Sequence, residues 1–391
     1  MTMDPEAAKG RSDGLRLATQ AECRFKCWTN SEHDFPQPDV WLGESQHAIT
    51  LDLVLRYAQG VGDAKTPRLV AISTSGDPAP RHGKLQINRG CFDRLFESFA
   101  MTSYISHVLT EEMFHLSRHT IYEEGGEKPT GLVLLMRIPR NSQSITLLIR
   151  ISLRDMSTIF FIAAAQESTV DYLHGRIVSA ASLLEQNPLF VLGFILEERL
   201  TRYWAHMEEL MLRVNEVETM TGMVQAGWKR HMLPESVERL SSFDSQLKQL
   251  HASHMDLCHC DTFLKFFMNL DVFCRETLRE IDDQRADLGL DRMTKQQTAQ
   301  FLELVGFWMT RYRYMHSKVQ EMLDRLRTQV SVVFSHIAQR DSNINLKVAS
   351  DSNRVANLAA RDSQVMKTIA VLTLTFLPTT LVTYGARESF T

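Results

Sequence analysis

The sequence predicts a mostly helical α+β protein, with an N-terminal α/β domain, a helical layer and a very long C-terminal stalk helix leading into a partial transmembrane helix. Short apolar runs of strand length occur between residues 47 and 166, where they are typical of buried strands. From residue 167 onward, apolar residues recur at helical spacing instead. No proline interrupts the chain between Pro234 and Pro378, so little in the sequence stops a long helix there.

The composition indicates a folded protein and gives no sign of a nucleic-acid partner. The chain has 391 residues, 44% hydrophobic and 23% charged, which is enough for two or three domains with a sizeable core. A formal net charge of -4 gives no basic field for nucleic acid. The six cysteines do not suggest a disulfide framework, and the first residues lack the apolar core of a signal peptide. We therefore expect the body to be cytoplasmic and reduced.

The first 166 residues divide into a flexible N-terminal arm, residues 1–46, and a cytosolic α/β domain, residues 47–166. Prolines 36 and 38 close the arm. The domain has a weak alternation at 49–53, apolar runs at 69–73, 132–138, 145–151 and 158–164, and a helical pattern at 91–100. The acidic stretch Glu124-Gly125-Gly126-Glu127 matches no phosphate-binding loop, so it predicts a hairpin loop.

Residues 167–292 predict the helical layer. One helix runs from 167 to 184 and breaks near Asn187-Pro188, and a second runs from 189 to about 221. After a break, helix continues to about Asp287, where Gly289 ends it.

Residues 293–368 predict the long stalk helix, with Thr294 as its N-cap. A helix over 294–383 would measure about 135 Å and could not be buried in one globule. It needs partner helices, which favours an oligomeric coiled-coil bundle.

Catalytic and metal-binding signals are weak. No nucleophile, acid–base or metalloprotease arrangement occurs, so we expect no catalytic residues and no enzyme activity. His251, His254 and Cys258 would share one helix face and could hold zinc, although a fourth ligand is missing. The alternative is that these three residues are ordinary polar positions on a helix and bind no metal. We expect no bound cofactor.

The segment 369–384 is apolar and uncharged, and the divergent tail 385–391 follows it. Its length is about 16 residues, against roughly 20 for a full membrane span. We expect a partial transmembrane helix, and from composition alone the segment could be a membrane anchor, a truncated pore or a buried terminal helix.

At residues 361–380, the sequence resembles the first membrane helix of the CorA-like divalent-cation (Mg²⁺) transporter family, in its divergent fungal-type branch. The resemblance rests on Met366-Lys367, the apolar run after it and Phe376-Leu377-Pro378-x-Thr380, while residues 337–345 resemble that branch's stalk. About 45 residues match well, and the rest matches only in architecture. The resemblance implies a homo-oligomer, with a pentamer expected, that passes magnesium or another divalent cation through a central pore. The cation would be transported or sensed.

The resemblance also implies particular site residues. The pore-lining positions would be Met366, Ile369, Thr373, Leu377 and Thr380. Their spacing places them on one helix stripe, which without the resemblance would be a packed coiled-coil seam. The family has an acidic site in its stalk. Asp351 lies near the position expected for that site, but the surrounding sequence does not match the family's pattern.

The chain departs from the family after Tyr384. The family's Gly-Met-Asn loop and second membrane helix do not follow, so we expect a truncation in the first membrane helix, by biology or by an incomplete gene model. We expect that such a chain does not conduct ions alone. The alternative is a non-conducting helical interaction or regulatory protein that binds full-length paralogous subunits. The expected location is the membrane with a cytoplasmic body, or soluble if the terminal segment does not insert.

Overall fold

The computed structural model describes residues 24–29, 69–76, 84–99, 108–109, 113–123, 125–139, 144–220 and 243–388, with only the backbone over 376–388. The chain divides into two compact units, residues 1–209 with 258–320 and residues 210–257 with 321–391. Three helices contribute residues to both units: α7 (Phe190–Met220), α8 (Phe243–Asp287) and α9 (Lys295–Glu388).

The first unit contains a six-stranded mixed sheet, in the order β1-β2-β6-β5-β4-β3. Its strands are β1 (Phe25–Thr29), β2 (Leu69–Ser75), β3 (His115–Tyr122), β4 (Pro129–Ile138), β5 (Ile145–Ser152) and β6 (Thr158–Ala164). Neighbouring strands pair antiparallel, except for the parallel pair of β2 and β6. The central strands are buried on both faces, which explains their continuous apolar runs.

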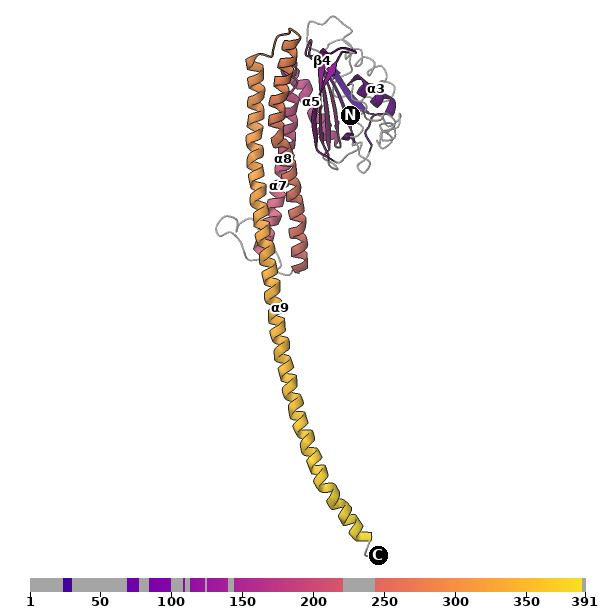
Figure 1. Ribbon diagram of the computed structural model, residues 1–391, viewed down its shortest axis with the longest axis vertical. Coiled ribbons are helices and arrows are strands. Elements are labelled where there is room, and N and C mark those ends of the chain that lie inside the picture. Colours follow the sequence, from indigo (N-terminus) through magenta and orange to yellow (C-terminus); the bar gives the residue numbers. More distant parts are fainter. Residues whose placement is uncertain are drawn as a thin grey trace. The chain divides into compact units, whose positions relative to one another are not determined.

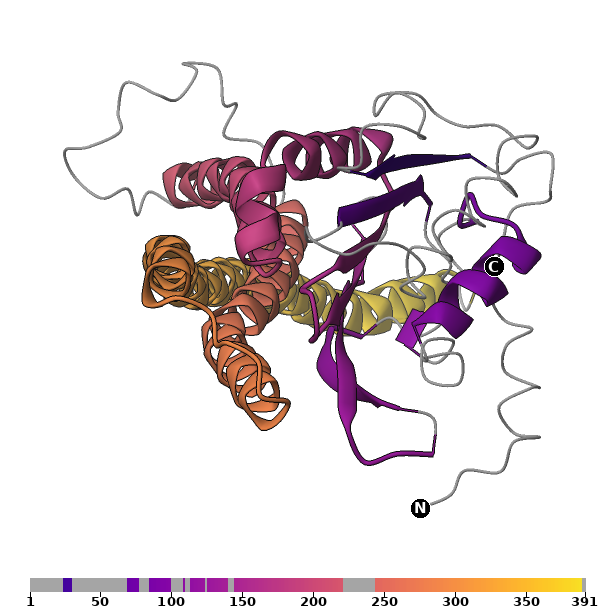
Figure 2. The same ribbon diagram turned by 90° about the horizontal axis from the view of Figure 1, so that it is seen from above.

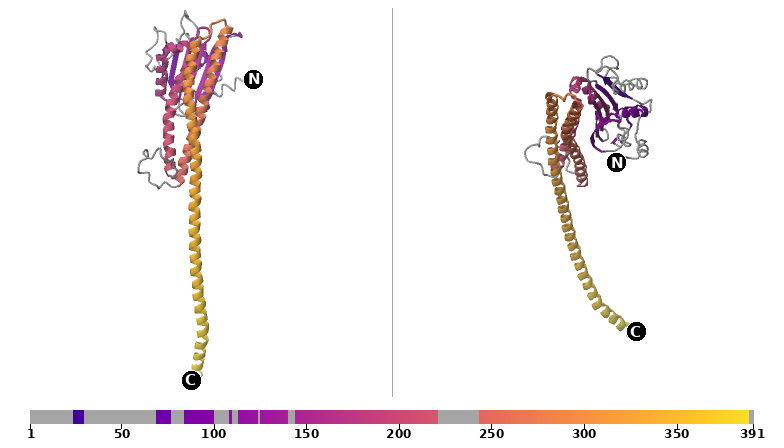
Figure 3. Two further views of the ribbon diagram at one scale, coloured as in Figure 1. Left: turned by 90° about the vertical axis from the view of Figure 1, so that its left-hand side faces the viewer. Right: turned by 45° about the horizontal axis from the view of Figure 1, so that its top comes forward.

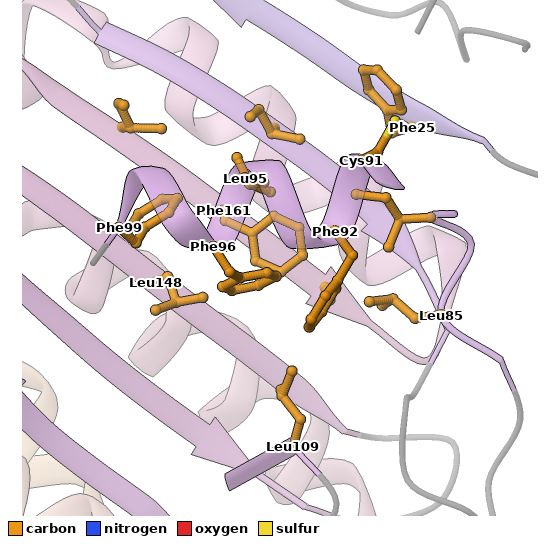
Figure 4. Close-up of a cluster of buried hydrophobic side chains, with 14 of the residues drawn as sticks. Phe25, Leu85, Cys91, Phe92, Leu95, Phe96, Phe99, Leu109, Leu148 and Phe161 are labelled. Carbon is orange, nitrogen blue, oxygen red and sulfur yellow. The ribbon is translucent and has the colours of Figure 1, made fainter. Parts of the chain in front are cut away.

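Helix α3 (Arg89–Ser98) covers one face of this sheet. Its apolar side chains lie over β5 and β6, and the ring of Phe96 meets that of Phe161 edge-on at 5.2 Å (Figure 4). The Asn88 side chain accepts a hydrogen bond from the Cys91 backbone N–H at 2.8 Å and so caps the helix. Side chains point alternately to the two faces of the sheet along each strand. The residues next to those that contact α3 therefore face the opposite side of the sheet.

Helices α5 (Glu167–Ser179) and α8 lie on the opposite face of the sheet from α3 (Figures 1 and 2). Buried Ser73 Oγ and His174 Nδ1 lie 2.8 Å apart, joining β2 to α5. On β3, Arg118 forms ion pairs with Glu276 and Glu280 of α8. Polar contacts thus fix both helices to the sheet.

The helical part of the first unit, which includes α6 (Ala181–Gln186), is held by stacked aromatic rings. Tyr203 stacks on Phe263 with centroids 3.5 Å apart, and Tyr312 donates from its hydroxyl to the Leu196 carbonyl at 3.0 Å. Gly193 permits a close approach of α7 to α9, because a Cβ there would lie 2.6 Å from Leu304 Cδ2.

The second unit packs the end of α7 and the start of α8 on α9. Arg325 donates from Nε and Nη2 to the two carboxylate oxygens of Glu218, at 2.7 and 2.6 Å, and from Nη2 to Asn215 Oδ1. The hydrogen bonds to the Glu218 carboxylate raise the pKa of Arg325. Arg213 and Asp256 add a second ion pair at 3.3 Å.

Several predictions of fold are confirmed. The protein is α+β and mostly helical, with a mixed sheet and a long C-terminal helix. The Gly125 turn, at φ +73°, joins β3 to β4 as the expected hairpin. Gly289, at φ +71°, ends α8, and Thr294 caps α9 through a reciprocal pair of hydrogen bonds with Gln297.

Other features differ from the expected layout or lie outside what is described. Strand β1 falls inside the predicted arm, and β3 was not predicted. The rest of the arm, apart from Arg24, and the pattern at 49–53 lie outside the described residues. Helix α9 is continuous from Lys295 to Glu388 and so extends past the expected end of the helix at residue 384 (Figure 3).

Candidate functional site

The candidate site is the exposed part of α9, residues 334–375. Up to Val333 the helix has a fully buried face, but from residue 338 to residue 375 every side chain is exposed. Large apolar side chains are among them: Val355 is 65% exposed, Met366 66% and Leu374 74%. Such a run of exposed apolar surface marks an interaction site.

Three of the five expected pore-lining residues have described side chains. Met366, Ile369 and Thr373 are exposed and lie on one stripe of α9. The Thr373 hydroxyl donates to the Ile369 carbonyl at 2.7 Å, so its oxygen stays available as an acceptor. Leu377 and Thr380 continue the stripe along the helix, but their side chains lie outside the description.

Asp351 is exposed on the same helix. It lines an open surface depression with Val348, Ser352, Val355 and Ala356. Val348 is 57% exposed and Val355 is 65% exposed, so this position combines charge with apolar surface.

The weak metal candidates lie along α8. His251 is exposed, while His254 and Cys258 are half-buried and both have other interactions. Among the described residues, no group of three or more His, Cys, Asp or Glu side chains could hold a metal ion.

A pocket of about 760 Å³ in the first unit was not predicted from the sequence. It lies between α7 and α9, and its lining includes Trp204, Trp308, Tyr314, Arg311 and Glu197. The Arg311 guanidinium stands 5.9 Å from the Trp308 ring centroid, a cation–π arrangement. No local pattern reveals this pocket, because its residues come from helices about 100 positions apart.

Charge is buried beside this pocket. Arg199 and Glu198 are almost fully buried and lie 2.7 Å apart, and burial lowers the pKa of Arg199. Nearby, burial and the carboxylate of Glu197 raise the pKa of Tyr172 to about 12. The Thr169 hydroxyl of α5 donates to Glu198 Oε1 of α7 at 3.2 Å, which joins the two helices.

Among the residues that the structure describes, no helix is both long and apolar enough to cross a membrane. Comparison with protein-family models gives no match, and comparison with curated proteins gives none either.

Proposed function

We propose that this chain is a subunit of a CorA-like transporter for magnesium or another divalent cation, assembled through α9. The observation that carries the proposal is the exposed apolar surface of α9 from residue 334 to residue 375. A helix with this surface needs partner helices.

The resemblance at residues 361–380 supports the choice of a transporter. In that arrangement Met366, Ile369, Thr373, Leu377 and Thr380 line the central pore, and Asp351 lies in the stalk. Mg²⁺ releases its water slowly, so a pore of hydroxyl oxygens and apolar constrictions suits a largely hydrated ion. The sheet-containing part forms the cytoplasmic body, and residues 369–384 lie in the membrane. The expected assembly is a homo-oligomer, with a pentamer expected, or an assembly with full-length paralogous subunits.

Uptake of Mg²⁺ in transport-deficient cells tests this function. Because the chain is not expected to conduct alone, it should raise uptake above that of co-expressed full-length paralogous subunits by themselves. Ile369→Trp should return uptake to background by filling the pore, whereas Val371→Trp, on another side of the same helix, should not. A chain that is assembled and membrane-bound, yet gives no uptake alone or with paralogous subunits, contradicts the transport proposal.

A second candidate is a non-conducting helical interaction protein that regulates such subunits through the same helix. The specific observation in its favour is that α9 continues through the uncharged segment into Arg387 and Glu388, since charged residues are costly inside a membrane. Assembly without uptake, together with altered uptake by co-expressed paralogous subunits, favours this candidate.

A further inference from the structure

The pocket between α7 and α9 in the first unit is lined by aromatic rings from both helices. Trp204 of α7 and Tyr314 of α9 lie with their ring planes 19° apart and their ring centroids 6.3 Å apart. Trp308 adds a third ring from α9. The volume of about 760 Å³ lies within the range of about 300–1,000 Å³ that is usual for small-molecule sites. The pocket therefore has the size and the aromatic lining of such a site.

Two of these rings are accessible to a ligand. Trp204 is 47% exposed and Tyr314 is 54% exposed, whereas the lining residue Leu200 is only 5% exposed. Indole and phenol rings have large apolar faces, and a second planar ring gains by stacking on them. A ligand with a planar ring can therefore cover the exposed faces of Trp204 and Tyr314.

Arg311 gives the pocket a positive charge. Glu197 also lines the pocket, but its carboxylate accepts a hydrogen bond from Arg176 Nη2 at 3.0 Å, so its charge is balanced. Arg311 is exposed and forms no ion pair with any residue that the structure describes. Its guanidinium lies instead 5.4 Å from the ring centroid of Phe307 and 5.9 Å from that of Trp308. The charge of Arg311 is therefore available to an anion.

We propose that this pocket binds a small molecule in which a planar aromatic ring carries an anionic group. The ring stacks on Trp204 and Tyr314, and the anionic group pairs with the guanidinium of Arg311. Aromatic phosphates, such as nucleotides, and aromatic carboxylates share this chemistry. The proposed site lies before residue 320 of the chain, so it does not use the exposed part of α9 that carries the proposed function.

The arrangement of Arg311 favours an anionic ligand over a cationic one. Aromatic rings by themselves attract cations, but the guanidinium of Arg311 already lies against Phe307 and Trp308. A cationic ligand beside it meets a like charge. An anionic ligand gains charge-assisted hydrogen bonds instead, because the planar guanidinium fits the oxygens of a carboxylate or a phosphate.

Calorimetric titration of the full chain, in buffer without divalent cations, tests the ligand class. The two probes are AMP and 1-naphthoate, and whichever binds more tightly distinguishes a phosphate source from a carboxylate source. Adenosine lacks the anionic group and inorganic phosphate lacks the ring, so each should bind at least about tenfold more weakly than AMP. Phenyltrimethylammonium carries a ring with a positive charge and should bind more weakly than 1-naphthoate.

Three results of the titration overturn the proposal. The first is that neither AMP nor 1-naphthoate binds. The second is that inorganic phosphate binds as tightly as AMP, because the ring then contributes nothing. The third is that phenyltrimethylammonium binds more tightly than both anionic probes.

Substitution of Arg311 tests the contact with the anionic group. Arg311→Gln should raise the Kd of AMP by about tenfold, because a charge-assisted hydrogen bond is lost, and should leave the Kd of adenosine unchanged. Arg313→Gln is the matched control, since Arg313 is exposed on the same helix and does not line the pocket. Equal effects of the two substitutions on AMP overturn the role of Arg311.

Substitution of Trp204 tests the stacking surface. Trp204→Ala should raise the Kd values of AMP and adenosine by similar factors of about tenfold, because both contain the ring. Leu212→Ala, another exposed apolar position on α7, should change neither. Circular dichroism measures whether each variant keeps its helix content. A folded Trp204→Ala chain that binds AMP as tightly as wild type overturns the site.

A second copy of the chain is the competing occupant of this pocket. If a neighbouring subunit covers Trp204 and Tyr314, Trp204→Ala should weaken self-association in sedimentation, and no probe should bind the assembled chain. That pair of results overturns the ligand site. Loss of transport in cells, with AMP or 1-naphthoate binding intact, contradicts the proposed function and leaves this site standing.

Discussion

Helix α9 shows two ways of using one apolar pattern. Before residue 334, one face of α9 is buried within the same chain, as Phe301, Val319 and Leu326 show with exposures of 0%, 0% and 1%. After Val333, residues of the same kinds at similar spacing are exposed, such as Val348 and Leu358. Apolar residues at helical spacing therefore specify that a helix has an interface, but they do not specify whether the partner helix lies within the same chain. The following predictions test this difference, beginning with the largest effect.

The largest difference is expected between Phe301, in the buried part of α9, and Phe334, in its exposed part. Phe301 is fully buried against Phe190, with ring centroids 5.4 Å apart, whereas Phe334 is 57% exposed. Phe301→Ala should lower the free energy of unfolding by about 3–5 kcal/mol because it leaves a cavity. Phe334→Ala should change the stability of the isolated chain by less than about 0.5 kcal/mol and weaken self-association instead.

Urea unfolding at low protein concentration, followed by circular dichroism, measures both stabilities. Sedimentation at higher concentration measures association. Equal losses of stability in the two variants would contradict the distinction between covered and uncovered surface.

The second comparison is between Arg325, whose carboxylate partner is buried, and Arg327, whose carboxylate partner is exposed to solvent. Arg325 holds Glu218, whose side chain is only 10% exposed, while the partners Arg327 and Asp324 are 67% and 72% exposed. Arg325→Leu should cost about 3 kcal/mol because it leaves a carboxylate buried and unpaired. Arg327→Leu should cost less than about 0.5 kcal/mol.

The double variant Arg325→Leu with Glu218→Leu should recover most of the loss, because no charge then remains buried. A double variant as unstable as Arg325→Leu alone would show that packing, and not the unpaired carboxylate, causes the effect.

The start of α9 gives the smallest effect. The Thr294 hydroxyl accepts from the Gln297 backbone N–H at 3.3 Å, and Thr294→Ala should cost about 1 kcal/mol. Thr328→Ala, an exposed position inside the same helix, should not destabilise, since alanine is the better helix former. Thermal unfolding of the two variants against wild type measures this difference, and equal midpoints would exclude a capping role.

The helices and the buried strands could be predicted because local residues specify them. Pro188, Gly289 and Thr294 mark helix ends by their own backbone chemistry. Strand β3 was missed because its polar residues, Arg118 and Thr120, bond to Glu280 of α8, about 160 positions away. Strand β1 was missed because only its long-range pairing with β2, such as Phe25 opposite Thr74, makes it a strand.

The candidate site was predicted in part. The sequence indicates the stripe from Met366 to Thr380, but apolar spacing alone could not tell covered positions from uncovered ones. Exposure of Val348, Val355 and Leu358 on α9 makes that distinction. The Trp204–Trp308 pocket needed the structure, because no pattern within one helix contains it.

Sedimentation velocity of the full chain tests the central claim most directly, with the wild type compared with Val355→Lys and Leu358→Lys. Wild type should sediment as an oligomer at tens of micromolar, in buffer and in mild detergent, roughly the range where modest interfaces associate. Both lysine variants should sediment as monomers with unchanged helix content. A monomeric wild type, or lysine variants that assemble as well as wild type, would contradict assembly through the exposed part of α9.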